Sequence, residues 1–505
     1  MRNLLIVTLM AITCCHAQIP TLDADFGSSG VTLADLTNGL DAVGTIGRQS
    51  DGKLVATVFG TYSIDGSIRL ARFTENGLLD TTFGVNGMVE TPFFCLGTDS
   101  KQRIAVQSDN KILVVGGIKT SVGLIHKNAL TRYEADGSLD MSFGDMGLSG
   151  GPGTSEAECV TVLEDGSIMV LGGSSSGVVL SKYLTSGYWD MGYADGGRIS
   201  FSFTDSTDDI EWAKKIIVQP DGTVLVLVEV EQLINDSRWR APAVAKLTAS
   251  GEFVTDFGSE GKWMGEMTKE SNAYDFSVLP DGTIVIVGDQ KSLATSFREG
   301  TIMKLDSAGN PISSFGSGGV VFDTLSGGTG DTTFHSNLIL DGKILCLAYL
   351  QTSLTTGDIG LARYLPDGTL DTTFGNQGKY ILDATGGVEV AVSMYLQPDG
   401  KCVVGGLTFT SALLARLDVG NLGTSEDRIN LITAWPNPFS DKVVLSGLTS
   451  ETQVALCDLS GKVLHESYLQ PDQPVWPLPQ SLAKGVYLLK LVSGNAYRTL
   501  KLVKS

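Results

Sequence analysis

Short apolar runs separated by tight turns dominate this chain of 505 residues. The runs AKKIIVQ and TVLVLVEV, for example, flank Pro220-Asp221-Gly222 and are rich in β-branched residues. Proline favours the second position of a type I turn, and a following glycine can adopt the left-handed conformation that produces a G1 bulge. Each such segment is therefore predicted to form a β-hairpin, and no helical periodicity accompanies it.

The hairpin pattern repeats along the chain with a spacing of 56 to 60 residues, and its turn aspartate stands at Asp51, Asp109, Asp165, Asp221, Asp281, Asp341 and Asp399. A second phrase, an aromatic residue followed by a small one and then by glycine three positions further on, begins at Phe26, Phe83, Phe143, Tyr193, Phe257, Phe315 and Phe374. A third strand precedes that phrase and a fourth follows it. Four strands in a repeat of about 58 residues are typical of a propeller blade, so residues 18–423 are predicted to form an all-β, seven-bladed β-propeller.

The two ends of the array indicate a closed ring. The array starts with the aromatic phrase at Phe26, whereas the last third-strand segment, LLARLDVGNL, has no such phrase after it. A strand near Val31 is therefore expected to complete the blade whose other strands lie near residue 415, which would remove free sheet edges. The recurring aromatic residues are interpreted as packing anchors between blades, because a phosphate-binding loop would require a helix after them.

The first residues of the chain have a different character. Arg2 precedes a short apolar run, and Ala17 places a small residue before Gln18. This order is typical of a secretory signal peptide over residues 1–17, cleaved between Ala17 and Gln18, and a lipoprotein signal at Cys14 is the alternative. No other stretch reaches about 18 apolar residues, so no transmembrane segment is expected in the mature chain.

The charge distribution excludes some partners. Residues 18–423 hold 27 basic and 49 acidic residues, so neither nucleic acid nor anionic lipid is expected to bind. Three histidines in the mature chain are too few for a histidine-built metal site, and no cofactor is expected, although loop carboxylates leave calcium binding open. Cys346 and Cys402 lie in apolar runs, where a small buried side chain is expected.

The repeated phrases resemble the delta-60 repeat of bacterial proteins, whose copies carry LDTTFG and QPDGK. Here LDTTFG stands at residues 79–84 and 370–375, and the resemblance extends over about residues 22–420. It implies a β-propeller and supplies no catalytic residues. The copies near Asp190 and Asp256 depart most from the pattern, so distortion is expected in those blades.

The period stops after Thr424. A polar stretch over residues 424–434 is interpreted as a linker, and alternating apolar and polar positions over residues 435–505 predict a small β-sandwich. Within that segment PNPF, DLSGKVL and LAKGVYLLKL precede a basic terminal strand. This order resembles the type A sorting domain of the type IX secretion system.

The resemblance to a sorting domain implies export. Its motif maps onto Pro436, Asn437, Pro438, Gly485, Tyr487, Lys501 and Lys504. It implies that the type IX secretion machinery is a partner, that the source is a bacterium of the Bacteroidetes type, and that the protein is secreted or attached at the outer cell surface.

Alternating strand directions give the predicted ring two faces. The Asp-Gly turns and aromatic phrases lie on one face, and connections of variable sequence lie on the other, where ligand contacts usually arise. Aromatic side chains stack on sugars and anchor interfaces. The candidate binding residues are therefore Trp239, with Arg238 and Arg240 beside it, and Trp212.

Three functions are consistent with these features: non-catalytic binding of an extracellular polysaccharide or protein, hydrolysis or elimination on a glycan, and a structural role at the cell surface. An enzyme would use Asp208 with Asp209, or Asp331 with His335, as acid and base. The sequence contains no nucleophile elbow, HExxH or Walker motif. Binding is the favoured interpretation, and no catalytic residue or metal ligand is assigned.

Overall fold

A computed structural model describes residues 19–504 except 37–40, 61–66, 95–102, 118–127, 151–155, 175–176, 207–208, 236, 267, 293, 352–356, 420–431, 447, 449–450, 459–461, 472, 480 and 494–495. Within these ranges every regular element is a β-strand, which confirms the all-β class. Among the described residues, no helix has the length and apolarity needed to cross a lipid bilayer. The predicted signal peptide with Ala17 and Gln18 lies outside the described residues, as does Asp208.

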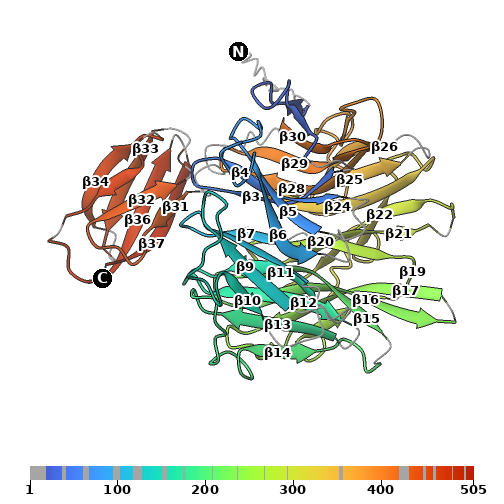
Figure 1. Ribbon diagram of the computed structural model, residues 1–505, viewed down its shortest axis with the longest axis horizontal. Helices are drawn as coiled ribbons and strands as arrows, with labels where there is room; N and C mark the ends of the chain where they lie inside the picture. Colours follow the sequence, from blue (N-terminus) through green and yellow to red (C-terminus); the bar gives the residue numbers. More distant parts are fainter. Residues whose placement is uncertain are drawn as a thin grey trace, which may run out of the picture.

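The repeat region forms sheets of antiparallel strands arranged around a common centre (Figure 1), which confirms the propeller architecture. One sheet has eight strands, and its two halves are joined only by the pairing of Phe94 on β6 with Gly117 on β8 among the described residues. We interpret these halves as two blades. They contain β3 (Asp41–Arg48), β4 (Leu54–Gly60), β5 (Ser67–Phe73) and β6 (Met88–Phe94), and β7 (Ile104–Val106), β8 (Ile112–Gly117), β9 (Asn128–Tyr133) and β10 (Leu148–Gly150).

The following blades keep the order of four neighbouring strands, including the two in which distortion was expected. The next two contain β11 (Glu156–Val162), β12 (Ile168–Ser174), β13 (Gly177–Tyr183) and β14 (Arg198–Phe201), then β15 (Ile210–Val218), β16 (Val224–Ile234), β17 (Ser237–Leu247) and β18 (Lys262–Met264), with β19 (Thr268–Lys269) also paired to β17. After them come β20 (Asn272–Val278), β21 (Ile284–Lys291), β22 (Arg298–Leu305) and β23 (Val320–Asp323), then β24 (Asp331–Leu340), β25 (Lys343–Gln351), β26 (Gly357–Tyr364) and β27 (Lys379–Leu382).

Both ends of the repeat region build the last blade. It contains β28 (Glu389–Leu396), β29 (Lys401–Thr408) and β30 (Ala412–Asp418), and it is completed by β1 (Thr21–Leu22) and β2 (Val31–Ala34). Val31 pairs with Ala415, as the sequence predicts. The Asp23 carboxylate also accepts hydrogen bonds from Lys401 Nζ and Arg416 Nε, each at 2.7 Å. The ring is therefore closed by backbone pairing and by buried charge.

The three repeated phrases meet in a single contact on the turn face. Arg132 Nε donates to Asp140 at 2.7 Å, and the guanidinium carbon lies 4.4 Å from the Phe143 ring centroid. Lys111, which follows the turn Asp109-Asn110 of the same blade, donates to the same carboxylate at 2.8 Å. We call the strand base, the aspartate and the aromatic residue the blade clamp. It explains why the three phrases recur together.

The blade clamp also holds the next blade. Arg132 Nη1 donates to the Thr185 carbonyl at 2.6 Å, and Gly187 lies so close to Phe143 that an added Cβ would stand 2.8 Å from its ring. The packing role expected of the aromatic residues is therefore present in the structure. The same base, acid and aromatic contacts recur at Arg72, Asp80 and Phe83, at Arg363, Asp371 and Phe374, and at Arg416, Asp23 and Phe26. Three other blades have Lys182, Lys246 and Lys304 in place of the arginine, and in the last two of them Val254 and Ile312 stand at the position of the aspartate.

The first strands of the blades are linked to one another around the centre of the ring. Six of the first strands contain a bulge or other register shift, namely β3, β11, β15, β20, β24 and β28. Polar groups near these shifts reach the next blade. Lys215 Nζ donates to Asp275 at 2.7 Å, Ser336 Oγ donates to the same carboxylate at 2.6 Å, and Ser393 Oγ donates to the Gly44 carbonyl. These hydrogen bonds link the first strands of neighbouring blades.

Two further sheets form the C-terminal sandwich. One contains β31 (Thr433–Trp435), β32 (Lys442–Ser446) and β35 (Val475–Pro477), and the other contains β33 (Thr452–Cys457), β34 (Val463–Leu469), β36 (Gly485–Ser493) and β37 (Ala496–Lys504). They share a core that includes Phe439, Trp476 and Leu489. The sandwich is therefore confirmed, and it begins at Thr433, inside the stretch predicted to be the end of the linker.

Candidate functional site

The residues of the predicted sorting motif converge at one end of the sandwich. Asn437 lies between Pro436 and Pro438, its Nδ2 donates to the Lys501 carbonyl at 3.0 Å, and its Oδ1 accepts from Val503 N at 2.8 Å. The first segment of the motif is thereby held against the terminal strand β37. The Lys501 side chain is exposed, as a recognition element requires.

The central segment of the motif joins the same contact. Phe439 is fully buried, with its ring centroid 6.4 Å from that of Tyr487 and 5.4 Å from Lys504 Nζ. Tyr487 donates its hydroxyl proton to the Ala483 carbonyl at 2.6 Å, and Gly485 pairs with Lys504 across β36 and β37. The segment 436–439 thus lies against residues of β36 and β37 that are more than 40 positions further along the chain.

The candidate binding residues on the ring lie in strands, and the expectation of a variable loop is wrong. Residues 229–242, interpreted from sequence as a connecting loop, continue β16 and β17 into a long hairpin in which Gln232 pairs with Trp239. The segment is mostly polar, but the cross-strand pairing of Glu231 with Arg240 favours extension of the ladder. We call its outer part, residues 231–240, the β16–β17 hairpin.

Both arginines of the candidate site are engaged by acidic side chains. Arg240 Nε donates to Glu231 Oε2 at 2.7 Å, and Arg238 Nη1 donates to Glu231 Oε1. Arg240 also donates to Asn272 Oδ1 in the next blade. These ion pairs therefore fix the orientation of the two guanidinium groups on the hairpin.

The two candidate tryptophans do not share a surface. Trp212 is opposite Glu229 on β16, whereas Trp239 is opposite Gln232. Side chains three positions apart on a strand point to opposite sides of the sheet. Both rings are half-buried, and they lie on different sides of the same blade. A ligand that contacts one of them on a flat surface does not reach the other.

The pairs considered for catalysis are not assembled as acid and base. Asp331 Oδ1 accepts from Arg298 N at 2.8 Å, while His335 Nδ1 bonds to the Ala391 carbonyl. Four residues along β24 correspond to about 13 Å, which is too far for direct proton transfer between the two side chains. Asp209 accepts a hydrogen bond from Gln232 at 2.7 Å, and its predicted partner Asp208 lies outside the described residues.

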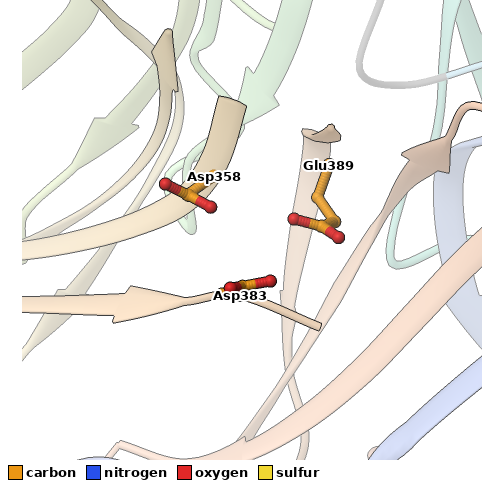
Figure 2. Close-up of side chains that lie close together, drawn as sticks. All are labelled: Asp358, Asp383 and Glu389. Carbon is orange, nitrogen blue, oxygen red and sulfur yellow. The ribbon is translucent and has the colours of Figure 1, made fainter. Parts of the chain in front are cut away.

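Sequence reasoning missed a cluster of three carboxylates. Asp358 lies on β26, Asp383 follows β27, and Glu389 is the first residue of β28; one oxygen of each lies within 4.8 Å of the other two. Figure 2 shows the three side chains around a common gap. Burial raises the pKa of Asp358, and the charge of Asp383 raises it further. No sequence motif signals this cluster, because three strand ends from two blades supply its members.

Two families match parts of the chain. The domain of unknown function DUF5122, described as a β-propeller, matches residues 49–83, 107–143 and 340–374. A secretion system C-terminal sorting domain matches residues 433–505. Each propeller match ends at the aromatic residue of a blade clamp in which arginine, aspartate and the turn lysine are all present. No curated protein matches the chain significantly.

Similar solved structures have low sequence identity. The β-propeller domain of the Trilobed protease from Pyrococcus furiosus is 9% identical, with 75% of this chain and 93% of that chain covered and a TM-score of 0.38. The PQQ-bound aldose sugar dehydrogenase from Streptomyces coelicolor is 10% identical, with 64% and 96% covered and a TM-score of 0.35. A prolyl endopeptidase is 10% identical, with 90% of this chain but only 55% of that chain covered and a TM-score of 0.40.

The structures just named assign no activity to this chain, whereas the two family matches agree with the blade clamps and with the assembled sorting motif. The C-terminal domain implies interaction with the type IX secretion machinery and export to the cell surface or extracellular space. The chain therefore contains β-propeller repeats of the DUF5122, delta-60 type and a C-terminal sorting domain of the type IX secretion system.

Proposed function

We propose that this chain is a non-catalytic binding protein, secreted or held at the outer cell surface, that contacts an extracellular polysaccharide or protein through the β16–β17 hairpin. The mature protein is proposed to begin at Gln18, after removal of residues 1–17 by cleavage behind Ala17. It would leave the cell by the type IX route, in a bacterium of the Bacteroidetes type.

The length of the hairpin carries the proposal. Strands β16 and β17 have 11 residues each, whereas the second strands of the other blades, β4, β8, β12, β21, β25 and β29, have six to nine. Two to five extra residues add about 7–16 Å to a strand. The hairpin therefore extends beyond β15, whose pairing with β16 reaches Glu231, and among the described residues β19 flanks it at Trp239 and Arg240. Leu233 is 65% exposed near its tip, and Trp239 is half-buried on the opposite side. An aromatic side chain on such a projection suits stacking on a sugar ring or anchoring an interface.

Ion pairs hold the β16–β17 hairpin in one conformation, which suits the binding of a ligand. Glu231 is buried and joins both Arg238 and Arg240, and Arg240 reaches the neighbouring blade at Asn272. A hairpin held in one conformation before binding loses less entropy when a ligand is bound. The arginines therefore support the proposal by positioning Trp239.

The proposal is tested by binding of the full chain to starch, cellulose, xylan, chitin and alginate, and by capture of proteins from the outer surface of the source cell. Saturable binding to one of these classes is expected. Trp239→Ala should weaken it at least tenfold, which corresponds to about 1.4 kcal/mol. Met191→Ala is the matched control, because Met191 is an exposed apolar residue on the turn face.

Three outcomes would contradict the proposed binding role, and each has a different meaning. Binding that is reduced by Met191→Ala and unchanged by Trp239→Ala would place the ligand on the turn face and contradict the role of the hairpin. Shortening of a polysaccharide during the assay would contradict a non-catalytic role. Absence of both binding and degradation would favour a structural role at the surface.

A further inference from the structure

The acidic cluster near the closing blade lacks a compensating positive charge. Within the part of the chain that the structure describes, no lysine or arginine forms an ion pair with Asp358, Asp383 or Glu389. Asp140 on the turn face, in contrast, is bonded to both Lys111 and Arg132. Three carboxylates within 4.8 Å of one another repel strongly unless a proton or a cation lies between them.

Glu389 supplies an independent indication of a ligand. It is fully buried, and its Oε1 accepts hydrogen bonds from the backbone and the side chain of Thr385. Its Oε2 is also buried and has no hydrogen-bond partner. A buried carboxylate oxygen without a partner is costly. In Figure 2 this carboxylate group points toward the gap that it shares with Asp358 and Asp383.

Acidic residues at the same position of other blades show what is particular here. Glu211 and Asp41, like Glu389, lie two residues before the bulge of a first strand and accept a hydrogen bond from the preceding loop, at Phe203 N and Leu36 N. Glu211 Oε2 is likewise buried without a hydrogen-bond partner among the described residues, so an unpartnered second oxygen is not by itself particular to Glu389. Holding the loop accounts for the other oxygen of Glu389. It does not account for Asp358 and Asp383, which belong to the neighbouring blade.

We propose that Asp358, Asp383 and Glu389 form a calcium site that joins the last two blades of the ring. Calcium binds oxygen ligands at about 2.3–2.6 Å, so two ligands on opposite sides of one ion stand about 4.6–5.2 Å apart. The 4.8 Å limit within which the three oxygens lie is compatible with a single ion. Magnesium usually takes one or two carboxylates and retains several waters, so three converging carboxylates favour calcium.

The proposed site lies where the backbones of the last two blades also pair with each other. Gly357, next to Asp358, forms a parallel bridge with Val388, next to Glu389. Asp383 is exposed, which gives the ion access from solvent, and its Oδ1 accepts from Gly386 N at 2.6 Å. Calcium bound here would stabilise the folded ring by linking one blade to the next.

The test uses the full chain treated with EDTA and then titrated with calcium in a calorimeter. One saturable site with a dissociation constant of about 10⁻⁴ to 10⁻³ M is expected, as in other extracellular calcium modules. Asp383→Asn keeps an acceptor for Gly386 N and should weaken binding at least tenfold. Asp195→Asn, at an exposed acidic residue on the turn face, is the matched control and should leave the affinity unchanged.

A second measurement tests the proposal even if a substitution in the cluster lowers the stability of the chain. The thermal midpoint of the wild-type chain should rise with calcium, and the midpoint of Glu389→Gln should not. Equal affinity for magnesium would overturn the assignment to calcium. Binding that is absent at ~20 mM calcium, well above the affinities of such modules, or binding that survives Asp383→Asn, would overturn the site.

Discussion

The two faces of the ring are held together by different kinds of contact. On the turn face one arrangement recurs: a strand base bonds an aspartate, covers an aromatic ring and reaches the next blade, as Arg132, Asp140 and Phe143 do. On the opposite face the contacts differ more from blade to blade. The Glu231 pairs orient the β16–β17 hairpin, and among the described residues a cluster of three carboxylates is found at the last two blades, formed by Asp358, Asp383 and Glu389.

This difference separates assembly from recognition. Because the turn face carries the contacts that recur from blade to blade, every copy keeps a turn aspartate and an aromatic residue there. The other face is then free to differ in strand length and charge without opening the ring. The comparison predicts that substitutions on the turn face reduce the free energy of unfolding, and that substitutions on the opposite face mainly affect ligands.

The largest expected difference concerns glycine. Gly187 has φ +89°, and a Cβ there would stand 2.8 Å from the Gly144 backbone nitrogen and from the Phe143 ring. Gly327 has φ +69°, and a Cβ there would meet nothing within 4 Å. Gly187→Ala should therefore lower the free energy of unfolding by about 3 kcal/mol, from overpacking and backbone strain together, and Gly327→Ala by about 1 kcal/mol from strain alone.

Urea unfolding of the two alanine variants checks this prediction. Equal decreases in the free energy of unfolding for the two variants would show that close packing between blades does not differ between the turn face and the opposite face. A loss at Gly327 larger than that at Gly187 would reverse the comparison.

A smaller difference is expected within the turn face itself. Asp140 is buried and bonded to two cations, so Asp140→Asn leaves Arg132 and Lys111 without their shared charge and should cost about 3 kcal/mol. Asp190 has one cationic partner among the described residues, Lys182 at 3.2 Å, and is partly exposed, so Asp190→Asn should cost at most about 1 kcal/mol.

Denaturant midpoints of the two asparagine variants measure the contrast. If Asp190→Asn and Asp140→Asn lower the free energy of unfolding equally, the blade clamp with arginine is no more stabilising than the one with lysine. The restriction of the DUF5122 matches to blades with a complete clamp would then have no energetic basis.

The repeated part of the fold could be predicted because a turn aspartate and an aromatic residue recur in every copy. The spacing of Asp51, Asp109 and the other turn aspartates predicted the hairpins, and the unmatched phrase at Phe26 predicted closure by β2. The sorting motif was recognisable for a similar reason, since its segments occur in a fixed order and the structure brings Asn437, Tyr487 and Lys504 to one end of the sandwich.

The candidate sites on the other face could not be predicted with the same success. Residues 229–242 look like a polar loop in the sequence, but cross-strand pairing of Glu231 with Arg240 extends the ladder. The opposite orientation of Trp212 and Trp239 depends on register, which composition does not reveal. The carboxylate cluster depends on which strand ends of two blades become neighbours, a long-range property with no local spacing.

The smallest expected effect is a difference in the pH dependence of stability. Burial alone would raise the pKa of Asp80, but hydrogen bonds from Thr82 and Lys53 and the charge of Arg72 outweigh burial and lower the pKa to about 2 from its ordinary 3.8. A carboxyl with a lower pKa in the folded state stabilises the fold above its unfolded pKa. This contribution is lost as the pH falls from about 4 to about 2. Asp80→Asn should therefore flatten the acid limb of a plot of unfolding midpoint against pH.

Glu211, on the opposite face, is the control with the reverse sign. Burial raises the pKa of Glu211, and hydrogen bonds from Ser202 and Phe203 offset only part of this effect. Its ionisation opposes folding, so the wild-type chain should gain stability relative to Glu211→Gln as the pH falls from neutral toward about 4.5, with the acid limb unchanged below that. If both variants flatten the same part of the pH profile, the carboxyl groups of the two faces do not differ in the way that their surroundings indicate.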